Sequence, residues 1–344
     1  MQFNRFFDSV TRYFTEHRFG RVGGILSALI GVYILVTTFL LFYWSQEPAI
    51  FNVQKVAAQD AHKESVSDVT GYTYTTALIH IGDTLLYKRG GYLSNDITPP
   101  GVFMDDIPNW EFGALVMLRD ATSSLRNYFS RSQSQSIENP DLAIADPKFN
   151  YDNNSWLFTE REYRKAIAAL KRYRDGLAKT QDTSTQFYAR ADNLAQYLTV
   201  VSQRLGSLSQ RLSASVGQLR VNTDLAGDSA AKQSTATGNT VMVKTPWLKI
   251  DDIFYEARGS TWALYHILSA INVDFDAVLR KKNAKPSVEQ IISELREAQR
   301  PTFSPMVLNG EGFGLTANYS LTMANYISRV NAAIIDLRAL LQNG

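Results

Sequence analysis

The densest group of residues able to do chemistry lies between Gly90 and Gly113, where glycines, prolines and aromatic residues surround four carboxylates. Among these, Glu111 is a candidate general acid, with Asp105 or Asp106 assisting, because two carboxylates a few residues apart can divide acid and base roles or hold a cation. A structural role competes with this interpretation. Aspartate before a helix and glutamate in its first turn also cap the helix and complement its dipole. The residue types favour the structural role over catalysis.

Polar and aromatic side chains in three stretches are candidates for binding a partner. The first stretch is the glycine- and proline-rich segment around Asn95–Trp110, and the second is the alternating polar run from Ser130 to Ser136. The third, Gln135 to Trp156, is expected to be a long irregular loop whose large aromatics pack onto another surface. A solvated helix end also explains the serine-rich run. The candidate partner-binding residues are Tyr92, Asn95, Trp110, Arg131, Gln133, Gln135 and Trp156.

Several classes of function are excluded by composition. The chain has no cysteine, which rules out disulfides, thiolate metal sites and thiol catalysis. Its four histidines are not spaced to share a metal along a helix, and Gly310–Gly314 resembles a phosphate loop only superficially because no strand precedes it. Beyond residue 21 the basic and acidic residues are equal in number, which argues against a nucleic-acid partner. We therefore expect no metal and no cofactor.

The elements that must position these residues begin with an apolar helix. Residues 22–46 carry no charge, and as a helix they extend about 37 Å, against a hydrocarbon core of about 30 Å. Tyr43 and Trp44 end the stretch, where aromatic rings favour the headgroup layer. A cleaved signal peptide would have a shorter apolar region and a small-residue cleavage site. The sequence predicts a transmembrane helix that anchors the chain in a lipid bilayer.

The charges that flank this helix predict its orientation. Four arginines precede it, and two lysines follow within the next 20 positions, so the positive-inside rule places residues 1–21 in the cytoplasm. These first residues show an amphipathic pattern typical of a helix in the membrane interface, although a frayed tail is an equal alternative. Residues 47–344 then lie on the other side of the membrane.

The large domain is expected to be a bundle of helices. Apolar residues at alternating four- and three-residue steps predict long helices within 182–220, within 250–278 and from 319 to the C-terminus, which should pack on one another. Thr159 with Glu162 and Ser287 with Gln290 have the spacing of capping boxes, and Asn109 can cap a helix through Phe129. Val66 to Tyr87 could be helix or contain a short strand, and Val241–Val243 is another strand candidate. A polar segment near 224–245 is expected to be a mobile linker.

The fold class is therefore all-α, with an N-terminal transmembrane helix followed by an elongated helical bundle with long irregular loops. The segments Gly90 through Gly113, Arg119-Asp120 and Ser130 through Ser136 also resemble a bacterial family of single-span envelope proteins known only as a domain of unknown function. The resemblance implies a Gram-negative inner-membrane protein with a periplasmic domain. It implies no activity and no site residues.

Three functions remain open at this point. The first is a non-enzymatic interaction or scaffold protein with an envelope protein partner, with homo-oligomers a further possibility. The second is a cell-wall or glycan-acting enzyme using Glu111 with Asp105 or Asp106, although the Glu-Ser pair of lytic transglycosylases is not convincingly reproduced by Glu64-Ser65. The third is a periplasmic sensor bundle that signals through a partner, because the chain lacks a second span.

Overall fold

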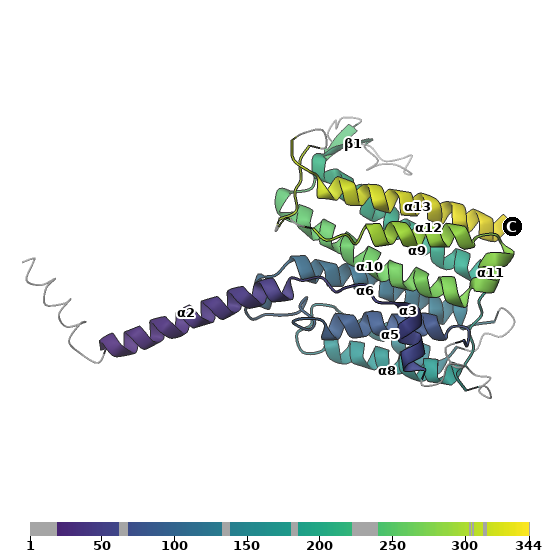
Figure 1. The fold of residues 1–344 in the computed structure, drawn as a ribbon, viewed down its shortest axis with the longest axis horizontal. Helices are drawn as coiled ribbons and strands as arrows, with labels where there is room; N and C mark the ends of the chain where they lie inside the picture. The colour runs from purple at the N-terminus through teal and green to yellow at the C-terminus, as the bar shows by residue number, and fades with distance from the viewer. Residues whose placement is uncertain are drawn as a thin grey trace, which may run out of the picture.

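A computed structural model describes residues 19–61, 68–132, 138–179, 185–221, 240–302, 304, 306–311 and 315–343. The described chain is mostly helical, as the periodicity predicts (Figure 1). The expected amphipathic tail lies mostly outside the described residues, as does most of the expected linker. The α-helices are α2 (Phe19–Trp44), α3 (Val53–Asp60), α5 (Tyr72–Tyr87), α6 (Asp106–Ser124), α7 (Pro140–Phe149), α8 (Thr159–Leu177), α9 (Ala191–Ser213), α10 (Ile250–Asp274), α11 (Asp276–Lys281), α12 (Lys285–Glu297) and α13 (Tyr319–Asn343).

Helix α2 stands out from the bundle (Figure 1). Its segment Gly23–Trp44 is 22 residues long, is long and apolar enough to cross a membrane, and has none of its residues buried inside the protein. Side chains such as Leu35 and Phe42 are 69% and 72% exposed. If water surrounded α2, these apolar side chains would not gain the free energy that burial of apolar surface provides.

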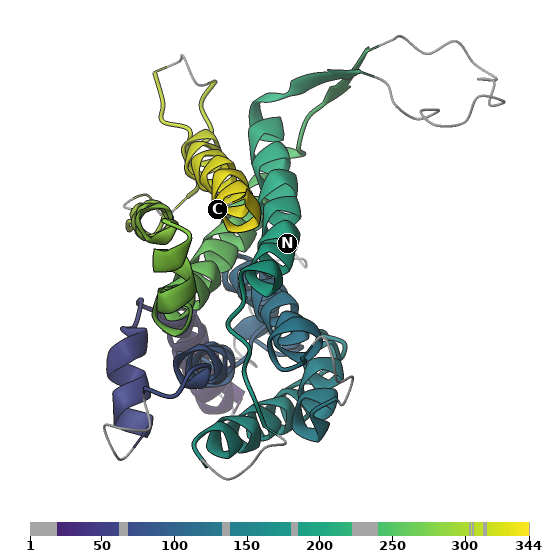
Figure 2. The same cartoon turned by 90° about the vertical axis from the view of Figure 1, so that its right-hand side faces the viewer.

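The bundle is built around α10, which packs along α6 on one side and against α12 on another. Helices α5, α7 and α8 extend the α6 side, and α9 packs along α13 (Figure 2). The expected packing of the three long helices is therefore confirmed for α9 with α13, whereas the closest neighbour of α10 is α6. The core is rich in aromatic residues, with Trp110, Trp262, Phe129 and Phe275 fully buried.

Two glycines let α6 and α10 approach each other at backbone distance. A Cβ atom on Gly259 would lie 1.8 Å from the carbonyl oxygen of Trp110, and one on Gly113 would lie 1.9 Å from that of Glu256. The Ser260 hydroxyl donates a hydrogen bond of 3.2 Å to the Gly113 carbonyl across the same contact. Any side chain larger than hydrogen at either glycine would push the two helices apart.

The structure corrects the end of one predicted helix and assigns the elements that the sequence left open. Helix α9 ends at Ser213, and the chain turns at Gly217 (φ +86°) into β1 (Gln218–Val221), which pairs antiparallel with β2 (Thr240–Val243). The strand prediction at Val241–Val243 is therefore confirmed, and the end of the expected linker is strand. Residues 72–87 are helix α5, and the expected irregular loop between Gln135 and Trp156 contains helix α7.

The predicted helix caps are wrong. The Thr159 hydroxyl donates to the carbonyls of Asp152 (2.7 Å) and Ser155 (2.9 Å) instead of accepting from its own helix. Helix α12 begins at Lys285, before Ser287, with Pro286 in its first turn and no side-chain cap. Helix α6 begins at Asp106 and is capped by Asp105, so Asn109 lies inside it.

Candidate functional site

The candidate catalytic residue Glu111 is fully buried and holds a loop. Its carboxylate accepts hydrogen bonds from the backbone N–H groups of Leu93 and Ser94, each 2.8 Å long, and from the Ser94 hydroxyl. It also forms an ion pair with Lys88, whose side chain is 4% exposed. Burial raises the pKa of Glu111, and Lys88, Ser94 and Leu93 oppose that shift. A carboxylate with all these partners and no exposed surface is built to fix the segment 88–94 at the start of α6.

Asp105 and Asp106 lie at the first turn of α6. The Asp105 carboxylate accepts from the Asp106 N–H (3.0 Å) at the first turn of α6. Burial, together with the negative charges of Asp105, Asp251, Asp252 and Glu47, raises the pKa of Asp106 to about 7. Within the described part of the chain no group of three or more histidine or acidic residues is arranged to hold a metal ion.

The candidate partner-binding residues divide into buried and exposed sets. Trp110 has no exposed surface, and its ring centroid lies 5.0 Å from that of Trp262 in the core. This burial corrects the expectation that Trp110 faces a partner. Tyr92 and Asn95 are also buried, and they donate to the backbone carbonyls of Asn153 and Ser155, both at 3.1 Å.

The remaining candidates lie at opposite ends of α6 or outside the described chain. Trp156 is 52% exposed and lies in the loop before α8, which Asn95 ties to the loop before α6. Arg131 follows the far end of α6 and is half-buried. Gln133 and Gln135 lie outside the described residues. Of the described candidates, Trp156 and Arg131 are therefore not brought together on one surface.

A site that the sequence analysis missed lies where α2 meets the bundle. Residues 45–52 form an extended segment, the tether, that runs along α10 from the end of α2 to the start of α3. The Glu47 carboxylate pairs with the Arg258 guanidinium, with Nε donating at 3.0 Å. Trp262 Nε1 donates to the carbonyl of Ala49 (3.3 Å), and the N–H of Phe51 donates to Nε2 of His266 (2.9 Å).

The spacing of these contacts explains how the tether fits the helix. The tether uses every second residue, about 6.6 Å apart in an extended chain, and α10 uses every fourth, about 6 Å apart along a helix. Two regular repeats of nearly equal length therefore run side by side over three steps. Phe51 completes the last step, because its ring stacks on that of His266 with centroids 3.8 Å apart. We call this set of contacts the seam.

Arg258 connects the seam to a third element. Its side chain is 5% exposed, and its Nη1 donates to the carbonyls of Ala298 (2.7 Å) and Arg300 (2.8 Å) just beyond the end of α12. A buried guanidinium is stable only when its donors are satisfied and its charge is balanced. The carbonyls and Glu47 provide both, so one side chain fixes the tether, α10 and the C-terminal end of α12.

His266 is held neutral inside the seam. Its Nδ1 lies 2.8 Å from the carbonyl oxygen of Trp262, which assigns the proton to Nδ1 and leaves Nε2 to accept from Phe51. Burial lowers the pKa of His266 to about 3. Protonation of Nε2 would place a second donor against the N–H of Phe51 and would break the last step of the seam.

Acidification is therefore expected to loosen the bundle. A histidine in the unfolded chain has a pKa near 6.5, whereas the pKa of His266 in the folded protein is about 3. Below pH 6.5 the unfolded chain therefore binds one proton more than the folded chain. As a result, the free energy of unfolding decreases as the pH is lowered. His266→Phe keeps a ring for Phe51 to stack on and removes the titration. Between about pH 7 and pH 4, its unfolding free energy by urea titration should fall less than that of the wild type. Equal slopes for the two proteins would contradict this role.

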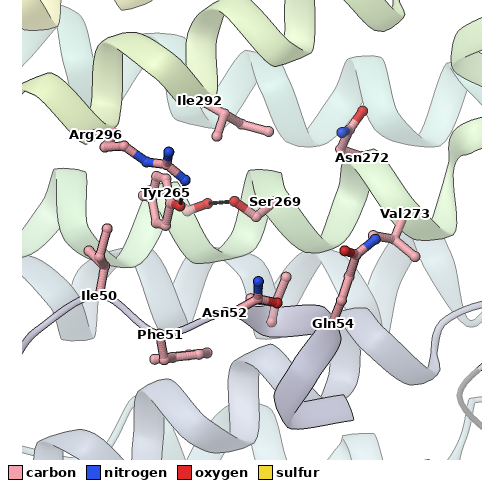
Figure 3. A pocket seen from close by; sticks show the side chains of 11 residues that line it. Ile50, Phe51, Asn52, Gln54, Tyr265, Ser269, Asn272, Val273, Ile292 and Arg296 are labelled. Atoms are coloured by element: carbon pink, nitrogen blue, oxygen red, sulfur yellow. Dashed lines mark hydrogen bonds between the residues drawn. The ribbon is translucent and has the colours of Figure 1, made fainter. Parts of the chain in front are cut away.

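Beyond Phe51 the seam opens into a cleft of about 330 Å³. Figure 3 shows Asn52 and Gln54 of the tether and α3 across from Tyr265 and Ser269 of α10, with the side chain of Asn272 on the side of α10 nearer α12. The Oδ1 atom of Asn272 is buried without a hydrogen-bond partner. The Arg296 guanidinium of α12 forms the rim, where it donates to the Tyr265 hydroxyl at 2.7 Å.

A second hollow of about 660 Å³ lies on the α2 side of the same seam and shares Ile50 and Arg296 with the cleft. The two hollows therefore follow the tether. Amide groups and guanidinium donors line them, and these groups bind carbonyl and carboxylate groups well. The arrangement is suited to binding a peptide-like group.

The fold and the site define an all-helical bundle protein that is joined through a hydrogen-bonded seam to one long, exposed apolar helix. Residues 19–344 match the family described as an uncharacterized protein conserved in bacteria (DUF2333), and the chain belongs to that family. The resemblance to a bacterial family of unknown function is thereby confirmed. No curated protein and no solved structure matches the chain.

Proposed function

We propose that the protein is a membrane-anchored, non-enzymatic interaction or scaffold protein of the bacterial cell envelope. In this proposal α2 spans the inner membrane, with the N-terminus in the cytoplasm and the bundle in the periplasm. The exposed apolar surface of α2 supports the anchor, and the charges on either side of it support the orientation. The burial of Glu111 within its ion pair argues against the enzyme that uses it.

The observation that carries this proposal is the seam. A flexible linker would let the bundle move freely above the membrane, as glycine- and serine-rich linkers do. Here the first residues after α2 are hydrogen-bonded to α10 at three successive steps, and Arg89 lies 4.9 Å above the ring of Tyr43. Such an attachment holds the bundle in one position relative to the anchor, which is useful for a protein that presents a surface to a neighbour.

We assign the partner-binding surface to the cleft beside Asn272. The Oδ1 atom of Asn272 has no hydrogen-bond partner among the described residues and can accept a hydrogen bond from a ligand. The Arg296 guanidinium at the rim attracts carboxylate and carbonyl groups. An extended segment of an envelope protein offers N–H and C=O groups in alternation, so it matches this mixed lining.

Site-specific photo-crosslinking in cells tests the proposal. With a photoreactive side chain at Gln54, which lines the cleft, the full-length protein should form an adduct with one envelope protein that mass spectrometry identifies. The same group at Ile335, 49% exposed on α13, is the control and should give none. Asn272→Leu should reduce the Gln54 adduct severalfold, because it removes the unpartnered acceptor. Recovery of the protein alone from both positions would count against a partner in the cleft.

A further inference from the structure

Exposed apolar side chains gather at one end of the bundle. They lie in the loops before α6, α8, α10 and α13 and in the β1–β2 hairpin, and several are more than 60% exposed. Leu248 is 75% exposed and Trp247 71%, just before α10, and Leu315 is fully exposed before α13. We call this set the apolar end; its members are Ile97, Val102, Phe103, Trp156, Leu157, Phe158, Leu219, Val221, Met242, Trp247, Leu248, Met306 and Leu315.

Hydrogen bonds connect most of these segments to one another. Asn109 Nδ2 donates to Asp252 Oδ1 (3.0 Å), which joins the starts of α6 and α10. Asn95 joins the loop before α6 to the loop before α8, and Arg258 holds the carbonyl of Arg300 at the beginning of the segment that leads to α13. The Thr245 N–H donates to the Ala214 carbonyl (3.0 Å) and so attaches the hairpin to the end of α9.

The apolar end is the end at which α2 joins the bundle (Figure 1). The ring of Trp44, the last residue of α2, lies so close to Gly90 that a Cβ atom there would be 2.7 Å from it. Gly90 belongs to the same connection between α5 and α6 that carries Ile97, Val102 and Phe103. At the opposite end of the bundle, the large apolar side chains of Tyr128 and Leu340 are each only 37% exposed.

We propose that the apolar end is a second membrane contact, which rests in the headgroup layer of the bilayer around the exit of α2. This inference depends on the proposed function, because α2 must span the bilayer for the surface to meet lipid. The surface is continuous with the span, and tryptophan, phenylalanine and leucine are the residues that insert shallowly at membrane interfaces. The seam holds the bundle close enough to the membrane for the contact to form.

The charged residues at this end fit a headgroup layer. Arg89, Arg161, Lys244 and Lys249 are exposed beside the apolar side chains, and the Arg161 guanidinium lies 4.7 Å above the ring of Phe158. Such cations reach lipid phosphates while their stems cover apolar surface. The carboxylates at the first turns of α6 and α10 keep this surface out of the hydrocarbon core.

Spin labels on the full-length protein test the inference. The chain has no cysteine, so single cysteines at Leu248 and Leu315 can each be labelled after reconstitution into vesicles of phosphatidylethanolamine and phosphatidylglycerol. We expect the ratio of oxygen accessibility to nickel-chelate accessibility, by electron paramagnetic resonance, to be severalfold higher at these positions than at Leu340 on the opposite end. A label at Leu35, inside α2, reports separately whether α2 is in lipid.

The outcomes separate this inference from the proposed function. If the Leu35 label is in lipid while the Leu248 and Leu315 labels are as accessible to the nickel chelate as the Leu340 label, the lipid contact is wrong and the anchor stands. If the Leu248 and Leu315 labels are shielded from both oxygen and the chelate, protein covers the apolar end and the inference is also wrong. A Leu35 label accessible to the chelate would overturn the anchor, and the lipid contact with it.

Discussion

Replacing Glu111 with alanine is expected to lower the free energy of unfolding by about 3–5 kcal/mol, because the ammonium group of Lys88 would remain buried without its counter-ion. The two backbone N–H groups of Leu93 and Ser94 would also lose their acceptor, although solvent can reach them once the loop loosens. The change should appear as a shift of the urea midpoint of the purified full-length protein, followed by tryptophan fluorescence.

Two further variants separate the charge from the packing. Glu111→Gln keeps the shape of the side chain and removes its charge, so it should also destabilise strongly. Adding Lys88→Met to Glu111→Gln removes the unpaired cation and should restore part of the loss. Glu297→Ala is the matched control, because it breaks the surface ion pair with Arg300, in which both side chains are at least 40% exposed, and should change stability by at most about 1 kcal/mol. A Glu111→Ala protein with the wild-type midpoint would mean that this carboxylate is not a structural anchor.

The general architecture was readable from the sequence because long helices repeat their apolar residues. Helices α9, α10 and α13 lie within the stretches with four-three spacing. The four-three spacing of the first stretch slips by one residue after Leu212, at Val216 and Leu219. This slip marks the end of α9, where the chain leaves the helix for β1, and Leu219 is 72% exposed. A break in periodicity was therefore a boundary signal rather than an irregularity within one helix.

The helix starts could not be predicted in the same way. A capping pattern states which side chain is able to accept from the backbone, but tertiary contacts decide which one does. Thr159 bonds to the preceding loop, and Asp105 takes the position expected for Asn109, whose side chain instead reaches Asp252 on α10. The Asn109 contact joins residues 143 positions apart, so local sequence does not contain it.

The structural roles of Glu111 and Trp110 escaped the sequence analysis for a related reason. The residue types between Gly90 and Gly113 are compatible with catalysis or binding. In the structure, Glu111 and Trp110 instead build the junction between the loop and the core. The seam joins residues 211 to 215 positions apart, a separation that no local pattern reveals. Its one signal is the spacing of Arg258, Trp262 and His266 at every fourth residue of one helix, opposite the alternating residues of a short extended segment.

Replacing Gly259 with alanine should have the second large effect. The new methyl group would lie 1.8 Å from the carbonyl oxygen of Trp110, which is backbone in the middle of a helix and cannot rotate away. Helices α6 and α10 must separate, and the loss of packing around Trp110 and Trp262 should cost about 3 kcal/mol, at the upper end of the usual range for overpacking. Gly113→Ala meets the Glu256 carbonyl in the same way and should behave alike.

Gly206 on α9 provides the matched control, because the nearest atom to its added Cβ would be 3.8 Å away, on Asn331. There alanine only restricts the unfolded chain and favours the helix, so Gly206→Ala should stabilise the protein by up to about 1 kcal/mol. The same substitution should therefore change sign between two helices of one bundle, as measured by urea midpoints of the three variants. Equal midpoint shifts for Gly259→Ala and Gly206→Ala would mean that α6 and α10 pack less closely than this geometry requires. The α6–α10 contact would then not be what positions Arg258, Trp262 and His266 against the tether.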